Sequence, residues 1–322
     1  MKILLRILVA LVIVIGAAFA YVSIFWLKNV DAEYPIPEIT IKADSAMLAR
    51  GAYLVNGPAH CVGCHIPIEQ LPRVAQGEKL PLIGGFEFDF PLGKIYSRNI
   101  TPDPETGIGR YTDGQLYRML RENITPAGKP TIDLMPFTEM SDYDIKSIIA
   151  YLRVQEPVRN EIPENEMTFL GKLVFGFILE VAPHEGTPPV IIEKDSSILY
   201  GEYLAKSVSN CRGCHTKRDL KSGAYIGPYY AGGFTFAPSA ETGGWTFTSP
   251  NLTFHEGTSI VAGWSEENFI ERFKTGRVHP TSPMPWESFK LMDETDLKAI
   301  YRFLKTVGPI ENKIEQIAVA PN

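Results

Sequence analysis

The chain has 322 residues, a length that at about 150 residues per domain predicts two domains with connecting material. Its residues are 45% hydrophobic and 21% charged, a composition typical of globular proteins that excludes disordered, collagen-like and coiled-coil classes. The formal net charge of −6 supplies no basic field to hold a polyanion, so nucleic acid is not an expected partner. Four cysteines are too few for a disulfide-dense scaffold of this length.

The N-terminus carries an uncharged segment, residues 7–27, that is long enough to cross a bilayer core as a helix. Two basic residues precede it, and Phe25 and Trp26 stand at its far end, where aromatic rings favour the interface. The positive-inside rule predicts a cytoplasmic tip at 1–6, an anchor in the cytoplasmic (inner) membrane and all later residues on the periplasmic, outer side. A signal peptide cleaved after Ala18-Phe19-Ala20 is the alternative, but the apolar run continues past that site.

Five sequence blocks recur in the same order later in the chain, at offsets of 149 to 152 residues. They pair Arg50-Gly51-Ala52-Tyr53-Leu54 with Tyr200-Gly201-Glu202-Tyr203-Leu204, residues 61–65 with 211–215, 97–101 with 249–253, 135–137 with 284–286, and 144–152 with 296–304. This order predicts tandem copies of one domain. The expected organisation is a linker at 28–44, domain 1 at 45–157, a linker at 158–194, domain 2 at 195–309 and a tail at 310–322.

Helical spacing of apolar residues and capping side chains predict that each copy is mainly α-helical. The expected helices are 44–56 and its counterpart after Asp195-Ser196, those beginning at Thr112 and Ser265, and the closing helices 142–154 and 294–307. The linker between the copies contains a mainly apolar patch, residues 169–181. Its longest uncharged run is too short to span a membrane. We expect a linker helix that packs against the domains, with an amphipathic segment on the membrane or on a partner subunit as the alternative.

All four cysteines fall in two C-x-x-C-H motifs, which consist of Cys61, Cys64 and His65 in the first copy and Cys211, Cys214 and His215 in the second. Two thiols three positions apart on one helical turn can form thioethers to the two vinyl groups of a haem, and the adjacent histidine then binds the iron. The motif is therefore typical of c-type haem attachment. A Cys₄ zinc site would need the two pairs much closer in sequence, a thioredoxin-like pair would need a βαβ pattern, and disulfides do not explain the repeated histidine. Two covalently attached haem c groups are predicted.

The sixth iron ligands are predicted to be Met135 and Met284, because a thioether opposite histidine is usual in electron-carrying cytochromes c. Each methionine is followed by proline and an aromatic residue, and the two lie 70 and 69 residues beyond their histidines. Met140 and Met292 also match one another but are expected to pack in the core. Four other histidines are possible ligands that lack a counterpart in the other copy, and His279 is the strongest of them.

Arg98, Asn99 and Asn251 are candidates for hydrogen bonds to haem propionates, because a partly buried carboxylate needs charged or polar partners. The simpler alternative is that these residues stabilise turns. The sequence contains no convincing general base or nucleophile.

Both copies resemble class I cytochrome c domains, in particular those of the multi-haem cytochrome subunits of membrane-bound alcohol and gluconate dehydrogenases. The residues that carry the resemblance are Arg50-Gly51-Ala52-Tyr53-Leu54, the two C-x-x-C-H motifs, Asn99-Ile100-Thr101-Pro102-Asp103, Thr106-Gly107-Ile108-Gly109, Met135-Pro136-Phe137 and Ala150-Tyr151-Leu152. Those subunits typically carry three haems, whereas this chain has two motifs. The stretch between Met135 and Asp142 is also shorter than its counterpart in the second copy.

The resemblance implies a mainly α fold, with two tandem class I cytochrome c domains after a single N-terminal transmembrane helix. It implies an electron-transfer subunit rather than an enzyme. Single electrons would pass from a dehydrogenase or quinol-oxidising complex to a soluble cytochrome or terminal oxidase, so the expected partners are redox proteins of a membrane respiratory complex. The alternative is a dihaem enzyme of the peroxidase or thiosulfate-oxidising type, which needs an open sixth position on one iron. A sensor or oxidase-assembly role is also open.

Overall fold

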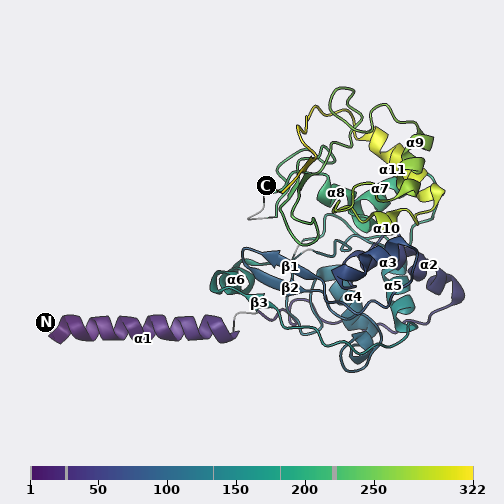
Figure 1. Ribbon diagram of the computed structural model, residues 1–322. Helices are drawn as coiled ribbons and strands as arrows, with labels where there is room; N and C mark the ends of the chain where they lie inside the picture. The colour runs from purple at the N-terminus through teal and green to yellow at the C-terminus, as the bar shows by residue number, and fades with distance from the viewer. Residues whose placement is uncertain (1, 26–27, 133, 182, 220–222, 322) are drawn as a thin grey trace.

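The computed structural model describes residues 2–25, 28–132, 134–181, 183–219 and 223–321, without the side chains of residues 23–25. About 39% of the chain is helical. Figure 1 shows a long N-terminal helix that projects from a body of two lobes. The predicted interfacial ring of Trp26 and the side chain of Phe25 lie outside the described part.

The projecting helix is α1 (Lys2–Phe25), which begins earlier than the segment predicted from charge alone. Its Lys2–Val22 portion is long and apolar enough to cross a membrane, and none of its apolar window is buried against the protein. The residues predicted as a cytoplasmic tip are therefore helical from Lys2 onward, because their backbone can continue the hydrogen-bond ladder whatever the surrounding medium.

The two lobes share a common order of elements, namely a first helix, the motif turn, two strands, two further helices and a third strand, with additional short helices in each lobe. The first lobe contains α2 (Ser45–Asn56), η1 (Cys61–Gly63), η2 (Ile68–Gln70), α3 (Leu71–Ala75), β1 (Glu87–Phe90), β2 (Gly93–Tyr96), η3 (Ile108–Arg110), α4 (Asp113–Glu122), α5 (Asp142–Arg153) and β3 (Glu166–Met167). The second contains α7 (Ile198–Tyr203), η5 (Leu204–Val208), α8 (Cys211–Cys214), β4 (Thr235–Phe236), β5 (Thr246–Thr248), α9 (Glu266–Thr275), α10 (Trp286–Phe289), α11 (Glu294–Thr306) and β6 (Ala318–Val319). Between them lie α6 (Phe169–Leu173) and η4 (Val174–Ile178).

The predicted helices form where local capping chemistry starts them. Thr112 caps α4 in a full capping box with Gln115, and Ser265 caps α9 in the same way. One predicted cap differs: Ser197, not Asp195-Ser196, caps α7, while the Asp195 carboxylate accepts the Ser197 backbone N–H. The extra residues that follow Met284 in the second copy form the short helix α10.

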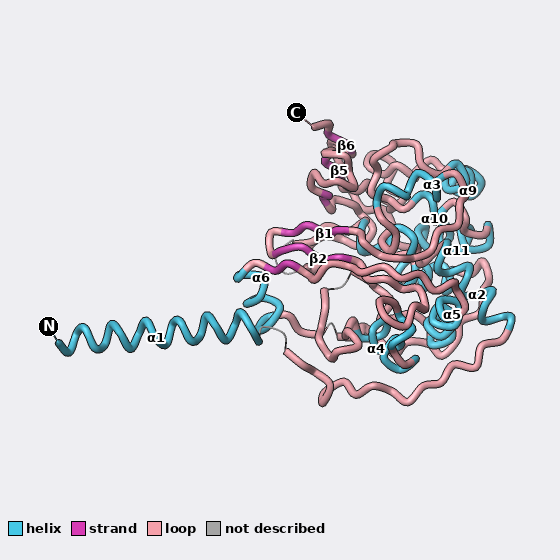
Figure 2. The backbone as a smooth tube through the Cα atoms, turned by 60° about the horizontal axis from the view of Figure 1, so that its bottom comes forward, coloured by secondary structure: helices cyan, strands magenta, loops and turns pink. Residues whose placement is uncertain are grey.

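Each lobe also has a small antiparallel sheet that the sequence did not predict, β1-β2-β3 in the first lobe and β4-β5-β6 in the second. The third strands come from far along the chain, with Met167 opposite Gly93 and Val319 opposite Thr246. Both third strands lie outside the ranges predicted for the two domains. Figure 2 shows the first sheet on the side of the lobe that faces α1.

Glycines allow the two main helices of each lobe to cross at close range. A Cβ atom on Gly51 of α2 would stand 1.9 Å from the Ser147 carbonyl oxygen of α5, and one on Gly201 of α7 would stand 1.9 Å from the Ala299 carbonyl oxygen of α11. No larger side chain fits at either crossing without a backbone shift. The first repeated sequence block therefore encodes this crossing.

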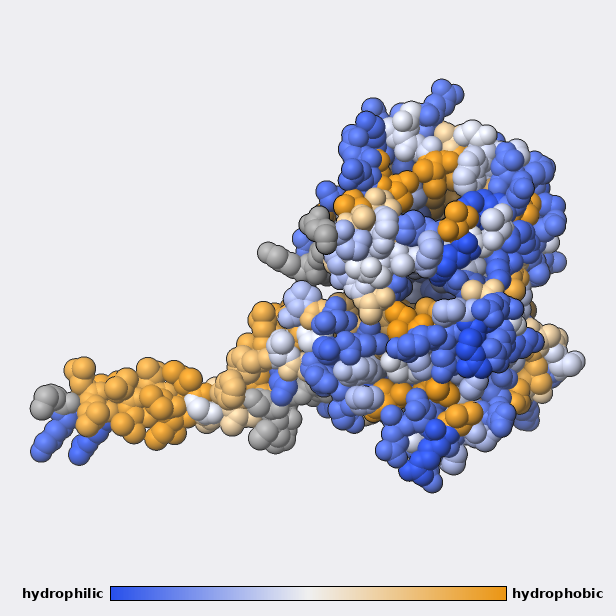
Figure 3. Space-filling model, in the orientation of Figure 1, coloured by the Kyte–Doolittle hydropathy of each residue, from blue (hydrophilic) through white to orange (hydrophobic). Residues whose placement is uncertain are grey.

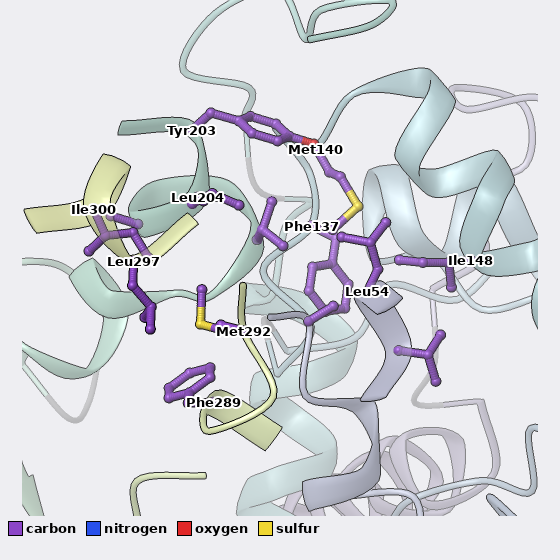
Figure 4. Packing of buried hydrophobic residues seen from close by; sticks show 14 of the residues in the cluster. Leu54, Phe137, Met140, Ile148, Tyr203, Leu204, Phe289, Met292, Leu297 and Ile300 are labelled. Atoms are coloured by element: carbon purple, nitrogen blue, oxygen red, sulfur yellow. The ribbon is translucent and has the colours of Figure 1, made fainter. Parts of the chain in front are cut away.

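The lobes share one hydrophobic core, which includes residues from both sides of their contact. Figure 4 shows Met140 with Leu54 and Ile148 of the first lobe, and Met292 with Phe289 and Leu297 of the second. Met140 and Met292 are fully buried, which confirms that they are packing residues.

Hydrogen bonds cross the lobe contact in a reciprocal pattern. The Tyr53 hydroxyl donates to Asp296 of the second lobe at 2.7 Å, and the Tyr203 hydroxyl donates to Asp144 of the first lobe at 2.7 Å. Arg50 binds Asp144 with two hydrogen bonds of 2.8 Å and also reaches the Tyr200 hydroxyl. Equivalent residues of the two copies thus bond each other's lobe, as expected around an approximate twofold axis.

Candidate haem-binding sites

Each C-x-x-C-H motif folds as a single tight turn. The residue before the first cysteine, His60 in one lobe and Asn210 in the other, adopts a left-handed conformation that starts the turn. Each motif histidine then donates its backbone N–H to the carbonyl of the first cysteine, at 2.9 Å from His65 to Cys61 and 2.8 Å from His215 to Cys211. His60, one of the alternative ligand candidates, thus occupies a turn position that asparagine fills in the second lobe.

The ring of each motif histidine is held by a backbone carbonyl. Nδ1 of His65 lies 2.9 Å from the Arg98 carbonyl oxygen, and Nδ1 of His215 lies 2.9 Å from the Pro250 carbonyl oxygen. Because a carbonyl only accepts, Nδ1 carries the proton and Nε2 keeps its lone pair. Burial lowers the pKa of both rings, which favours the neutral form. Proteins orient metal-binding histidines by this kind of hydrogen bond, so the residues present fit a haem iron.

In each lobe a glycine pair that the sequence analysis missed holds the following loop against the motif histidine. Gly84 donates its N–H to the His65 carbonyl at 2.8 Å, and Gly232 donates to the His215 carbonyl at 2.7 Å. Both glycines have positive φ, and a Cβ atom on either would meet the backbone of the carbonyl segment within 2.7 Å. The signal was present, because residues 84–86 (Gly-Gly-Phe) recur at 232–234.

The cysteine thiols are half-buried and not joined by disulfides. Burial raises the pKa of Cys61, Cys64 and Cys211 to about 12 and that of Cys214 to about 11. Within the described ranges, no three or more His, Cys, Asp or Glu side chains gather in a way that could hold a metal ion. The four thiols are thus free to form the thioethers that the motifs predict.

Met135 and Met284 are both half-buried and pack against the edge of the shared core. The backbone after each is the same: Phe137 donates its N–H to the Met135 carbonyl and Trp286 donates to the Met284 carbonyl, both at 2.8 Å. The shorter loop in the first copy therefore leaves the local conformation after Met135 intact. Axial ligation by the two methionines stays a prediction.

A cavity of about 430 Å³ opens between the lobes beside the first motif. Its wall includes Val62 and Gly63 of that motif and also Pro283 and Pro285, which flank Met284 of the second lobe. A Cβ atom on Gly63 would lie 3.8 Å from the Pro285 side chain. The first motif therefore adjoins the loop of the second lobe that carries Met284.

Two of the three candidates for propionate contacts, Asn99 and Asn251, use their side-chain amides for hydrogen bonds within the chain. Asn99 donates to the Thr106 hydroxyl and the Val158 carbonyl and accepts two hydrogen bonds from Thr101. Asn251 makes the equivalent bonds in the second lobe, with the Ile310 carbonyl in place of Val158. All four hydrogen-bonding positions of each amide are used, which favours the turn-stabilising alternative.

The Arg98 guanidinium donates to the Pro163 carbonyl at 2.8 Å and to the Asn165 side chain at 2.6 Å. Its backbone carbonyl is the acceptor for His65. Arg98 thus ties the start of the interlobe linker to the segment that orients the histidine, and a propionate contact stays a prediction.

The remaining histidines have other surroundings. His279 stands edge-on to the rings of Trp245 and Phe247, at 4.7 and 5.0 Å between ring centroids. His184 pairs with Glu122 and Glu139, and His255 bonds within its own turn. These contacts favour structural roles.

The comparisons with known proteins agree with this chemistry, although no family model matches the chain. The chain is 30% identical over 283 residues to the cytochrome c subunit of a quinone-dependent alcohol dehydrogenase from Gluconobacter oxydans, covering 83% of this chain and 56% of that protein. It is 29% identical over 292 residues to the fructose dehydrogenase cytochrome subunit of Gluconobacter japonicus, covering 87% and 56%. It is also 28% identical over 277 residues to a diheme cytochrome c-type protein of Cereibacter sphaeroides, covering 78% and 83%.

This chain spans only about half the length of the dehydrogenase cytochrome subunits that it matches. The matches nevertheless extend over most of this chain and include both C-x-x-C-H motifs within their length. As the sequence resemblance predicted, the chain is a homologue of the cytochrome c subunits of alcohol, fructose and gluconate dehydrogenases and of a diheme cytochrome c.

Proposed function

We propose that this chain is a membrane-anchored dihaem cytochrome c, built from two class I cytochrome c domains, that relays single electrons. The donor would be a respiratory dehydrogenase or a quinol-oxidising complex. The acceptor would be a soluble cytochrome or a terminal oxidase on the outer face of the inner membrane. The relatives support the electron-transfer class, because they are cytochrome subunits of dehydrogenases and a diheme cytochrome.

The residues that would hold the two haems are matched in the two lobes. Cys61 and Cys64 would form the thioethers of the first haem and Cys211 and Cys214 those of the second. His65 and His215 would bind the two irons, with Met135 and Met284 as their second protein ligands. Each haem would supply a one-electron iron couple, and a methionine opposite histidine favours a high reduction potential.

The observation that carries the proposal is the repeated histidine geometry. In both lobes the motif imidazole donates Nδ1–H to a backbone carbonyl at 2.9 Å. This contact fixes the ring before and after electron transfer, so little rearrangement is needed when the charge on the site changes. Orientation of this kind is what a protein supplies to a cofactor that carries the redox chemistry.

The contact between the lobes supports a relay between two sites. The first motif adjoins the loop that carries Met284, and the lobes are joined by the reciprocal Tyr–Asp hydrogen bonds. An electron that enters at one lobe would therefore find the second site next to it, at a separation fixed by the shared core.

The proposal is tested by counting covalent haem and looking for turnover. The denatured full-length protein, expressed with a c-type maturation system, should give two c-type haems per chain by pyridine haemochrome absorbance and intact mass. The C214S variant should keep the first haem attached through two thioethers. One haem per chain, or catalytic turnover of peroxide or thiosulfate by the isolated chain, would overturn the relay.

A further inference from the structure

Residues 169–178, which form α6 and η4, make an apolar projection on the first lobe that is called the apolar foot here. The foot lies in the linker between the two copies. Figures 1 and 2 place α6 beside the body end of α1.

Hydrogen bonds at the N-terminal end of α6 fix the foot to the first sheet. Thr168 caps α6 by accepting the Gly171 N–H, and both its backbone N–H and its hydroxyl donate to the Leu92 carbonyl at 3.0 Å. Gly171 lies so close that an added Cβ would stand 2.0 Å from the same carbonyl oxygen. Within the foot, the Phe175 side chain is buried. The segment is therefore held in one orientation by the β1–β2 turn.

Its outer face is apolar and exposed. Phe169 and Leu170 are 40% and 60% exposed, and Phe177 and Ile178 are 59% and 69% exposed. Figure 3 shows hydrophobic colour running from α1 onto the adjoining edge of the body. Four large apolar side chains on one small projection indicate an interaction surface rather than scattered surface residues.

The contact with α1 identifies what covers this face. The ring of Phe169 stacks on that of Phe19, with 4.6 Å between centroids and 18° between planes. Phe19 lies within the apolar part of α1 that is long enough to cross a membrane, and the uncharged run continues beyond it to Leu27 in the sequence. Interfacial helices bury their apolar face about 5–10 Å into the headgroup boundary. The medium that surrounds Phe19 therefore also reaches the foot.

From this geometry we infer that the apolar foot is a second membrane contact, which inserts Leu170, Phe177 and Ile178 into the headgroup and upper acyl region of the leaflet on the side of the lobes. The inference rests on the proposed anchoring by α1. Anchoring through both α1 and the foot, rather than through α1 alone, holds the first sheet toward the bilayer. It also limits how the lobes rotate above the membrane surface.

The test uses bimane attached to single introduced cysteines in the full-length, haem-loaded protein, reconstituted in phosphatidylcholine–phosphatidylglycerol vesicles. I178C reports on the foot and V12C on the middle of α1. L199C on α7 is the matched control, because Leu199 and Ile178 are both 69% exposed. Lipids brominated near the ester end or near the methyl end of the acyl chain quench only a label that touches the chain at that depth.

The inference predicts that bimane at position 178 is quenched more by shallow than by deep bromine, that position 12 shows the reverse order, and that position 199 is not quenched. An unquenched label at 178 with a quenched label at 12 would overturn the apolar foot while leaving the anchor intact. It would also leave a second protein chain as the cover for this face. An unquenched label at 12 would overturn both the anchoring and the inference that rests on it.

Discussion

One backbone carbonyl decides which nitrogen of each motif histidine is available to a metal. The spacing of the motif predicted His65 and His215 as ligands, but the carbonyls of Arg98 and Pro250 that hold them were not predictable. They lie more than thirty positions further along the chain, so no local pattern points to them. The same distance hid Gly84 and Gly232, whose positive φ became meaningful only when the loop was folded over the histidine.

The predicted ligation by Met135 and Met284 is tested by substitution. Replacing Met284 with histidine should shift one haem to a markedly lower reduction potential and remove about half of the weak near-infrared band of methionine ligation, because bis-histidine ligation loses the effect of the thioether. M135H should do the same for the other haem. M292L is the control, since Met292 is fully buried in the core. An unchanged spectrum in M284H would mean that Met284 is not a ligand.

Glu185 links the interlobe segment to the second motif. Its carboxylate accepts two 2.8 Å hydrogen bonds from Arg212 and pairs with Lys206. These partners lower the pKa of Glu185 from 4.5 to about 2, with the Arg212 hydrogen bond the largest cause. A lowered carboxyl pKa stabilises the folded state above the unfolded value, and this contribution is lost as the pH falls from 4.5 toward 2.

The E185Q variant should therefore be less stable than the wild type near neutral pH, by a modest amount because the site is partly exposed to solvent. The difference should vanish as the pH falls toward 2. Urea unfolding followed by Soret circular dichroism at several pH values measures it. E315Q, which alters an exposed pair with Lys313, should match the wild type throughout. A pH-independent effect of E185Q would contradict this explanation.

At the scale of elements, the helices were predictable because their signals are local. The pairs Thr112–Gln115 and Ser265–Asn268 each mark the start of a helix within four positions. The sheets were not predictable: β3 and β6 are two residues each and pair with strands about seventy positions earlier. Strands that short carry no alternation that can be recognised.

The helix crossings are the most constrained contacts between elements. G201A should lower the free energy of unfolding by at least the 1–3 kcal/mol that is roughly typical of overpacking, because the new Cβ would meet the Ala299 backbone oxygen. G51A should act similarly in the first lobe. G263A is the control, since nothing lies within 4 Å of a Cβ there. Equal stability of G201A and G263A by urea unfolding would mean that the crossing is looser than described.

At the scale of the whole molecule, the shared core and the reciprocal hydrogen bonds join the lobes. The repeat in the sequence predicted two copies but not how they meet. The residues at the contact, such as Tyr53 and Asp296, lie more than two hundred positions apart in the chain. The contact explains why tyrosine recurs at the fourth position of the first repeated block.

Removing a tyrosine hydroxyl from this contact should lower the free energy of unfolding of both lobes together rather than of one lobe. Y203F leaves the buried Asp144 carboxylate and the Ser141 N–H with one partner fewer, which costs about 1–3 kcal/mol for an unsatisfied buried group. The urea midpoints of unfolding, followed by the Soret signal of each haem, should then fall by the same amount. Y229F, at a tyrosine that is 47% exposed, is the control. Separate transitions for the two haems in the wild type would contradict a single cooperative body.

The central claim, two histidine–methionine haems in a relay, is tested most directly by an equilibrium redox titration of the purified protein, with optical, near-infrared and EPR spectra at each step. The account predicts two low-spin haems with positive reduction potentials. Both should show the weak near-infrared band of methionine ligation. A high-spin haem, or one of markedly low potential, would contradict it. Such a result would instead favour the dihaem enzyme with an open or replaceable position on one iron.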